Sequence, residues 1–405
     1  MGCCGVIAEY NPFHLGHAYQ LRQAKALSGG APIIVAMSGS LVQRGDIAAF
    51  DKRLRAKWAL QNGADLVLEL PALFSLAHAE RFALGGVALL QATGLLDSLS
   101  FGAEDAELAV LEKAAKCSLY EYPAFQERLS HHLAAGRSFP AARAAALQDW
   151  TGDPDLACIA AKPNNILAIE YLKAVRKLDS AARPIAVGRV GSAHDAAPEA
   201  GCFASASALR QAMEQCNMDL LRSGVPDSVY ADAYQRIAAL SAPASIATLD
   251  GPILYALRRL SCAELAQLPD VAEGLENVFY TACRECTSYS ELLRAVKSKR
   301  YTLARLRRIC LCALMGITKS DWAANPLPRY LRVLGVRKES VDLLSQLSRE
   351  ATLPIVMGKA DCDCLEPIAR RALALDLFAG ELFAMASPHP QPAAFEFSFP
   401  LLTVE

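Results

Sequence analysis

The chain has 405 residues, of which 53% are hydrophobic and 20% are charged. This balance supports a large buried core and excludes a wholly disordered chain, and the length predicts two to three domains. Lysine and arginine total 41 against 42 aspartate and glutamate, which gives a net charge of -1. The chain is therefore not a uniformly basic nucleic-acid coat protein, although a local basic patch is compatible with this sum.

The cysteines and the apolar runs indicate where the protein works. Thirteen cysteines with irregular spacing are typical of a reducing compartment. The pairs Cys283/Cys286 and Cys362/Cys364 lack the partners that would complete a zinc site. The sequence shows no secretory signal and no run of 18 apolar residues. We expect a cytoplasmic protein with no membrane partner.

Short apolar runs alternate with helical patterns over the first hundred residues. We expect helices at 16–27, at 50–61 and from Pro71 to about 93, and strands at 3–8, 32–37, 65–70 and 96–101. The strands are apolar throughout and are separated by helices. This pattern predicts an α/β fold, a Rossmann-like doubly wound parallel sheet covered by helices on both faces.

The rest of the chain is mainly helical in pattern. A helical insertion at about 105–180 precedes a further strand at 184–187. We therefore expect a nucleotide-binding domain at 1–215, a mostly α-helical, basic C-terminal domain at 216–386, and an extended tail at 387–405.

The strongest motif is HxGH, formed by His14, Gly16 and His17 directly after the first strand. A helix that starts here offers free N–H groups and the positive end of its dipole to a phosphate. Gly16 permits close approach of a nucleotide, and two imidazoles can stabilise the charge that develops as pyrophosphate leaves. The motif predicts an ATP site with His14 and His17 as catalytic residues.

A second motif, FASASALR at 203–210, lies far away in the sequence. Ser205 is suited to cap a helix, and Arg210 is placed to reach the β- and γ-phosphates, which makes it the third catalytic candidate. Polar residues also follow the other predicted strands, at the edge where ligands bind in doubly wound sheets. These residues are Ser38, Gln43, Arg44, Gly45, Glu69, Gly102, Glu104 and Arg189.

These motifs together resemble those of the tRNA(Met) cytidine acetate ligases, members of the HxGH nucleotidyltransferase superfamily. The resemblance covers residues 1 to about 210 motif by motif and extends more loosely to about 350. Its pieces are GVIAEYNPFHLGH (5–17), MSGSLVQRG (37–45), GADLVLELP (63–71), AERFALGGV (79–87), FGAE (101–104), KPNNILAIEYLKA (162–174), FASASALR (203–210), RYTLARLRR (300–308) and YLRVLG (330–335).

The resemblance implies a two-step reaction. Acetate attacks the α-phosphate of ATP to give acetyl-adenylate, and the wobble cytidine of elongator tRNA(Met) then takes the acetyl group to form N4-acetylcytidine. No Asp/Glu cluster is typical of a metal cage, so we expect any Mg²⁺ to be carried on the nucleotide phosphates. The implied ATP-binding residues are Ile7, Ala8, Glu9, Tyr10, Asn11, Pro12, Phe13, His14, Leu15, Gly16, His17, Ala18, Tyr19, Gln20, Gly102, Asn164, Arg189 and Val190, with Asn165 as the alternative to Asn164.

A basic segment independently favours an RNA partner. Residues 289–338 contain twelve lysines and arginines but only two acidic residues, with Tyr301, Trp322 and Tyr330 interleaved. Cations that contact phosphates and aromatic rings that stack on bases are typical of RNA binding. In a helix near 301–315, Arg305 and Arg308 should lie opposite the apolar face. The candidate tRNA-binding residues are Arg300, Arg305, Arg307, Arg308 and Arg332.

Two other functions are compatible with parts of this pattern. A nucleotidyltransferase that adenylylates a small phosphorylated metabolite would share HxGH, but it would not need the basic helical region. A non-catalytic RNA-binding protein would not need His14, His17 and Arg210. We expect neither a DNA partner nor a membrane partner.

Overall fold

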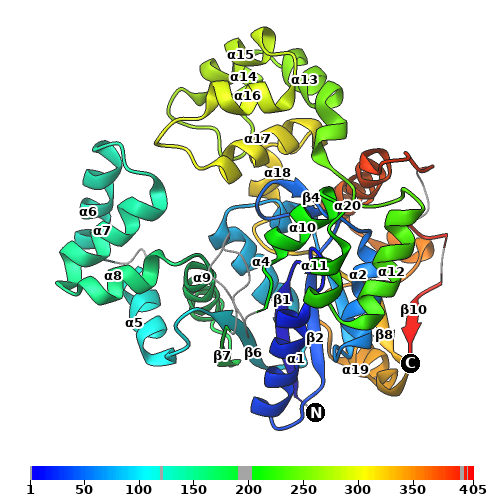
Figure 1. The fold of residues 1–405 in the computed structure, drawn as a ribbon. Coiled ribbons are helices and arrows are strands. Elements are labelled where there is room, and N and C mark those ends of the chain that lie inside the picture. The colour runs from blue at the N-terminus through cyan, green and yellow to red at the C-terminus, as the bar shows by residue number, and fades with distance from the viewer. Residues whose placement is uncertain (1, 119–121, 190–202, 393–395, 399) are drawn as a thin grey trace.

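The computed structural model describes the chain except residues 1, 119–121, 190–202, 393–395 and 399. A central, mostly parallel sheet has helices on both faces, as the sequence predicts (Figure 1). Its strand order is β10-β8-β5-β2-β1-β6-β7. The strands of this path are β1 (Cys3–Ala8), β2 (Ile33–Ser38), β5 (Leu66–Leu70), β6 (Leu96–Ala103), β7 (Arg183–Gly188), β8 (Leu331–Arg337) and β10 (Leu402–Val404).

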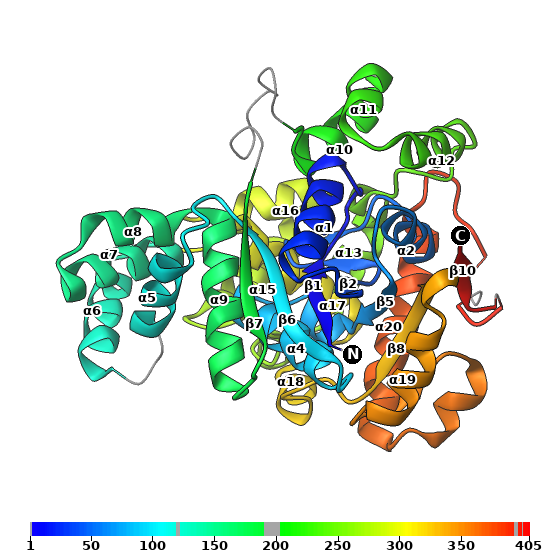
Figure 2. The same cartoon turned by 90° about the horizontal axis from the view of Figure 1, so that it is seen from below.

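Alternate residues of each central strand enter two different cores. In β1, Cys3 and Ile7 pack toward α4 (Ala79–Gln91), whereas Cys4 and Val6 pack toward α1 (Leu15–Leu27) and α2 (Lys52–Gln61). Both faces of the strand are therefore buried, which explains why the strands are apolar at every position. Figure 2 shows α1 and α4 on opposite sides of the sheet.

The helix expected from Pro71 to about 93 is divided into α3 (Ala72–Ser75) and α4. The His78 side chain accepts a hydrogen bond from the Arg81 N–H at 3.4 Å and so caps the start of α4. Histidine is an uncommon cap, and the sequence pattern gave no sign of this break.

The predicted insertion lies between β6 and β7 and forms a separate lobe of four helices beside α9 (Pro163–Lys177), at the left of Figure 1. Helix α9 packs against α4 and leads the chain back to the sheet. The four helices are α5 (Leu108–Ser118), α6 (Pro123–Ala134), α7 (Phe139–Thr151) and α8 (Pro154–Ala161).

After β7 the chain forms three helices beside the sheet and then a second lobe, at the top of Figure 1. The first three are α10 (Ala206–Glu214), α11 (Met218–Gly224) and α12 (Asp227–Ala238). The following helices are α13 (Asp250–Arg259), α14 (Cys262–Leu265), α15 (Leu275–Glu285), α16 (Tyr289–Val296), α17 (Leu303–Met315) and α18 (Lys319–Ala324). Among the described residues, no helix is long and apolar enough to cross a membrane.

The expected domain boundary at residue 386 is wrong, because the chain returns to the sheet before it. Strand β8 pairs antiparallel with β5, and β10, from the expected extended tail, pairs parallel with β8. Helices α19 (Asp342–Glu350) and α20 (Pro367–Ala386) lie between these two strands in sequence, and the short β9 (Ile355–Val356) adds to β8. Residues 331–404 thus complete the sheet of the N-terminal domain.

Candidate nucleotide site

The two histidines of HxGH cap the start of α1, and each holds the other in position. The Gly16 N–H donates to His14 Nδ1 at 3.0 Å, and the His14 N–H donates to His17 Nδ1 at 3.3 Å. The two rings stack with centroids 3.7 Å apart. Because each Nδ1 accepts a backbone hydrogen bond, a neutral ring carries its proton on Nε2 and can donate only from that atom.

Both imidazoles are neutral in the free protein. Burial, together with the positive charges of Arg189 and Arg210, lowers the pKa of His14 to about 3. Burial, with His14 and Arg189, also holds the pKa of His17 well below its ordinary value. A neutral imidazole donates a hydrogen bond from Nε2–H to a phosphate oxygen without giving up the proton. The pair therefore forms a preorganised oxyanion site.

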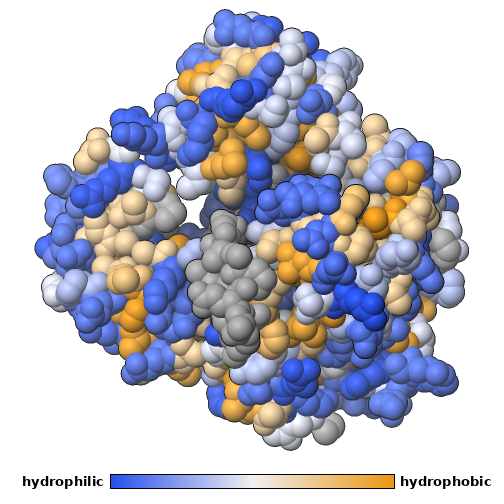
Figure 3. Space-filling model, viewed as in Figure 1, coloured by the Kyte–Doolittle hydropathy of each residue, from blue (hydrophilic) through white to orange (hydrophobic). Residues whose placement is uncertain are grey.

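A cavity of about 870 Å³ opens in front of these rings, at the carboxyl ends of the parallel strands. It lies where the insertion and the C-terminal lobe approach the sheet, and the surface is hollowed there (Figure 3). The predicted site residues that line it are Ile7, Ala8, Glu9, Tyr10, Asn11, His14, His17, Gln20, Gly102, Asn164, Arg189 and Arg210.

Six predicted ATP-binding residues do not line the cavity. Phe13 and Ala18 point into the hydrophobic core on the α1 side of the sheet. The others belong to the same turn and helix start without forming part of the wall, namely Pro12, Leu15, Gly16 and Tyr19. Val190 lies outside the described residues. The HxGH segment therefore contributes residues that fix the conformation of the turn as well as residues that line the cavity.

The second motif meets the first across almost 200 residues of sequence. Ser205 Oγ accepts the Ala208 N–H at 3.2 Å and caps α10, as predicted. Arg210 Nη1 donates to the Asn11 carbonyl at 2.7 Å, and Nη2 donates to Ser207 Oγ at 3.3 Å. Ser205, Ser207 and Arg210 all line the cavity. Two helix starts, those of α1 and α10, thus face the same space.

Only one of the two candidate asparagines faces the cavity. Asn164 lines it, donates to Glu104 Oε1 at 2.6 Å and accepts from Arg189 Nη1 at 3.3 Å. Asn165 is fully buried, and its Oδ1 accepts the backbone N–H groups of Glu104 and Asp105 at 2.9 and 3.2 Å. Asn165 therefore shapes the loop after β6, whereas Asn164 is available to a ligand.

A buried arginine that the sequence did not single out connects the loops after β1 and β2. Arg55 of α2 has no exposed surface and donates to the carbonyls of Glu9 at 2.7 Å, Ser38 at 3.0 Å and Phe50 at 2.9 Å. It also donates to the carbonyl of Gly39. This guanidinium ties the ends of β1 and β2 together, so that the loops carrying His14 and Arg44 keep their relative position.

The far wall of the cavity comes from the insertion. Arg143 of α7 donates to Glu170 Oε1 at 2.6 Å, and Lys173 lies 2.8 Å from Glu170 Oε2. All three side chains are buried, and Phe139 and Tyr171 line the cavity beside Arg143. The insertion therefore closes one side of the site with charge as well as aromatic surface.

The basic segment contributes three of its predicted arginines to the cavity wall. Arg300, Arg305 and Arg308 line the cavity, whereas Arg307 does not. Arg305 Nε donates to the Asp270 carbonyl at 2.8 Å, and its guanidinium lies over the Tyr301 ring. The C-terminal lobe thus places these cations on the wall of the cavity that also contains His14 and His17.

Three expectations about the basic segment are wrong. Arg308 does not lie on a solvent-facing side of its helix, because it is buried in an ion pair with Asp270 at 2.8 Å. Arg332 is 3% exposed in β8 and is paired with Glu69 and Glu396, so it cannot contact tRNA. Tyr330 is also buried and donates to Asp376, which removes it from the candidates for base stacking.

Comparison with known protein families and sequences identifies the family of this chain. The model of the family described as HIGH Nucleotidyl Transferase matches residues 1–396. The tRNA(Met) cytidine acetate ligase of Thermoanaerobacter sp. (strain X514) is 35% identical over 403 residues, which cover 99% of this chain and 100% of that protein. The ligase of the same name from Acetivibrio thermocellus is 33% identical, with 96% of each chain covered.

Solved structures agree with the sequence relatives. The crystal structure of Thermotoga maritima TmcAL bound with alpha-thio ATP matches with a TM-score of 0.92 at 30% identity, and 100% of both chains is covered. The apo form I of the same protein gives a TM-score of 0.94. The chain therefore belongs to the HIGH nucleotidyl transferase family and, within it, to the tRNA(Met) cytidine acetate ligases.

Proposed function

We propose that this protein activates acetate with ATP and transfers the acetyl group to the wobble cytidine of elongator tRNA(Met). The observation that carries the proposal is the stacked pair His14 and His17, which line one cavity together with Arg210. The relatives that are similar over their whole length carry the name of this activity. The reaction takes place in the cytoplasm, where its tRNA substrate is found.

The first step joins two anions, and the site residues reduce their repulsion. A carboxylate oxygen of acetate attacks the α-phosphorus of ATP, the bond from that phosphorus to the bridging oxygen breaks, and pyrophosphate leaves. His14 and His17 donate to the α-phosphate oxygens as charge builds there. Arg210, Ser205 and Ser207 hold the β- and γ-phosphates at the start of α10.

The second step releases AMP. The N4 amine of the cytidine attacks the acetyl carbonyl, the bond from that carbon to the phosphate oxygen breaks, and one amine proton is lost. Asn164, Gly102 and Arg189 hold the nucleoside part of the adenylate. The C-terminal lobe presents Arg300 and Arg305 to the RNA backbone at the cavity entrance.

Any Mg²⁺ in the reaction enters with the nucleotide. The described residues include no group of three His, Cys, Asp or Glu side chains that could hold a metal ion. Magnesium is commonly carried on nucleotide phosphates with few protein ligands. Its contribution here is to neutralise phosphate charge.

The test is incubation with labelled acetate, ATP and bulk tRNA, followed by digestion of the RNA to nucleosides. We expect label in N4-acetylcytidine and acetate-dependent exchange between ATP and pyrophosphate. Exchange that does not depend on acetate would contradict the proposal and favour a small phosphorylated metabolite as the acceptor of the adenylyl group.

A further inference from the structure

The hairpin of β3 (Leu41–Val42) and β4 (Asp46–Ile47) contributes to the cavity a residue that has no role in the reaction described so far. The two strands pair antiparallel, and residues Gln43, Arg44 and Gly45 form the turn between them. Gly45 has φ +75°, and a Cβ there would lie 2.5 Å from the backbone nitrogen of Arg308. Only glycine therefore allows this turn to approach α17 so closely.

The turn is held from both sides through Gln43. Its N–H donates to Glu9 Oε1 at 2.6 Å, and its carbonyl accepts from Arg308 Nη1 at 3.2 Å. Glu9 belongs to the nucleotide loop, and Arg308 belongs to α17. The backbone next to Arg44 is thus fixed between the nucleotide site and the C-terminal lobe, although the turn lies in a loop.

Arg44 is a free cation at the wall of the cavity. Its side chain is exposed and lines the cavity, and it forms no hydrogen bond or ion pair with the part of the chain that the structure describes. By contrast, Arg308 is paired with Asp270, and Arg143 is paired with Glu170. An arginine on a fixed turn, with no partner in the protein, has its donors available to an anion.

The electrostatic neighbours of Arg44 indicate which anion it meets. Burial lowers the pKa of Arg210 and of Arg189, and the positive charge of Arg44 lowers both further. Asp46, on the same hairpin, opposes that shift in Arg210. Arg44, Arg189 and Arg210 line the same cavity, together with Ser207 at the start of α10. Three guanidinium groups on the wall of one cavity form a site for a polyanion.

We propose that Arg44 is a further substrate-binding residue, which holds the β- and γ-phosphates of ATP together with Arg210 and stabilises the pyrophosphate as it leaves. The role of Arg44 in the departure of pyrophosphate rests on the proposed function. Its role in binding ATP does not depend on that function. When the bond from the α-phosphorus to the bridging oxygen breaks, negative charge accumulates on the β-phosphate, and Arg44 offsets it.

The test compares Arg44→Gln and Arg44→Lys with Arg22→Gln, a control on an exposed part of α1 that does not line the cavity. Calorimetry should show that Arg44→Gln weakens ATP binding by about tenfold or more but leaves AMP binding within about twofold, because AMP lacks the β- and γ-phosphates. Arg44→Lys should recover part of this loss. Equal weakening of ATP and AMP, or no change in either, would overturn the proposal.

Exchange kinetics separate the remaining assignments. In acetate-dependent exchange between ATP and pyrophosphate, Arg44→Gln should raise the KM of both, while the KM of acetate stays unchanged. A rise confined to the KM of acetate would make Arg44 a carboxylate ligand, and a loss confined to tRNA affinity would make it an RNA contact. Both results overturn the proposal. Wild-type protein without acetate-dependent exchange would refute the proposed function instead, and the calorimetric comparison would still test Arg44.

Discussion

Arg332 and Glu69 face one another across the antiparallel pair β8 and β5 and form a buried ion pair at 3.0 Å. Lys52 and Glu396 complete the cluster, because Lys52 lies 2.7 Å from Glu69 and 2.8 Å from Glu396. Two cations and two anions, with Arg332 and Glu396 far in sequence from Lys52 and Glu69, thus neutralise each other between the sheet and the C-terminal segment.

Replacement of Arg332 by methionine should therefore destabilise the protein without affecting RNA contact. We expect a loss of about 3–5 kcal/mol in the free energy of unfolding, because the change leaves an unbalanced carboxylate in the interior. Urea unfolding measures this, with the exposed Arg349→Met as the control. Weaker tRNA binding by a variant of undiminished stability would contradict the assignment of Arg332 to the core.

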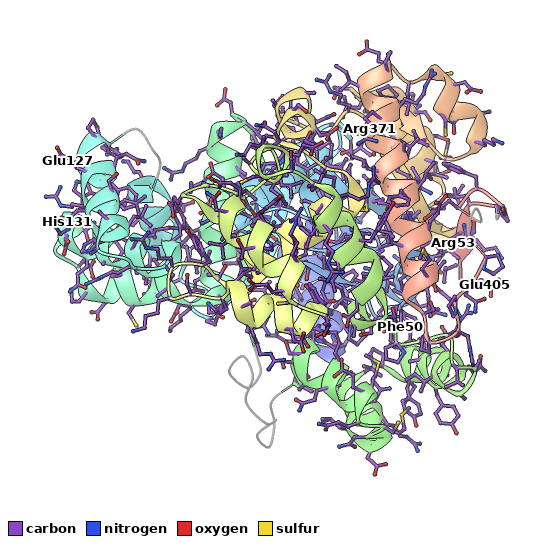
Figure 4. The ribbon with its side chains drawn as sticks, turned by 90° about the horizontal axis from the view of Figure 1, so that it is seen from above. Phe50, Arg53, Glu127, His131, Arg371 and Glu405 are labelled. Carbon is purple, nitrogen blue, oxygen red and sulfur yellow. The ribbon has the colours of Figure 1, made fainter. Side chains whose placement is uncertain are left out.

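Replacement of His17 by asparagine should slow adenylation by about 100- to 1,000-fold, because one preorganised donor to the α-phosphate is lost. The matched control is His131→Asn, since His131 lies on the outer surface of the insertion lobe (Figure 4). Both variants should unfold at similar temperatures. Acetate-dependent exchange measures the rate, and equal rates for the two variants would remove His17 from the reaction.

The buried carboxyl of Asp376 should make a contribution to stability that falls as the pH rises from about 4 to about 7. Burial and the charge of Glu69 raise the pKa of Asp376 from 3.8 to about 7. Between these values the folded protein keeps a proton on Asp376 that the unfolded chain releases, so this contribution to the free energy of unfolding decreases with pH. The lowered pKa values of His14 and His17 act in the opposite direction. In urea unfolding, Asp376→Asn should therefore shift the slope of the free energy of unfolding against pH toward more positive values than in the wild type. An unchanged slope in the variant would assign the effect to other groups.

Charge reversal at Arg300 should weaken tRNA binding while exchange persists. Arg300 is exposed at the cavity entrance, in contrast to the buried Arg308. The loss should be greatest at low salt, and wild-type binding should weaken steeply from about 50 to about 200 mM salt, because phosphate contacts release counterions. Filter binding of Arg300→Glu measures this against Arg349→Glu. Equal losses in the two variants would indicate a general effect of charge.

The early strands could be predicted from the sequence because each is a continuous apolar run bounded by turn residues. Strand β8 could not, because Arg332 and Arg337 made its sequence resemble the basic helical segment. Their partners, Glu69 and Asp65, lie more than 250 residues away in the sequence, and only the folded structure shows that the charges are neutralised.

The candidate site was predictable where function depends on local sequence. His14, His17 and Ser205 lie at helix starts, where the local sequence pattern places them, and Ser205 caps α10 as predicted. The pattern did not predict that the His14 side chain accepts the Gly16 N–H, or that the His17 side chain accepts the His14 N–H. Arg55 and the hairpin turn depend on contacts between loops after different strands. A buried arginine in a helix produces no periodic pattern, so the hydrogen bonds from Arg55 to four backbone carbonyls could not be predicted from the sequence.

The position of β8 also has a consequence for synthesis on the ribosome. Strand β5 emerges early, but its outer edge stays open until residues 331–337 are made, and β10 can pair only once residues 402–404 have left the tunnel. The nascent chain therefore carries an unpaired strand edge from the synthesis of β5 until that of β8, and such edges promote association between chains. Translation that stops before β8 would leave a product with a complete nucleotide loop and an aggregation-prone flank.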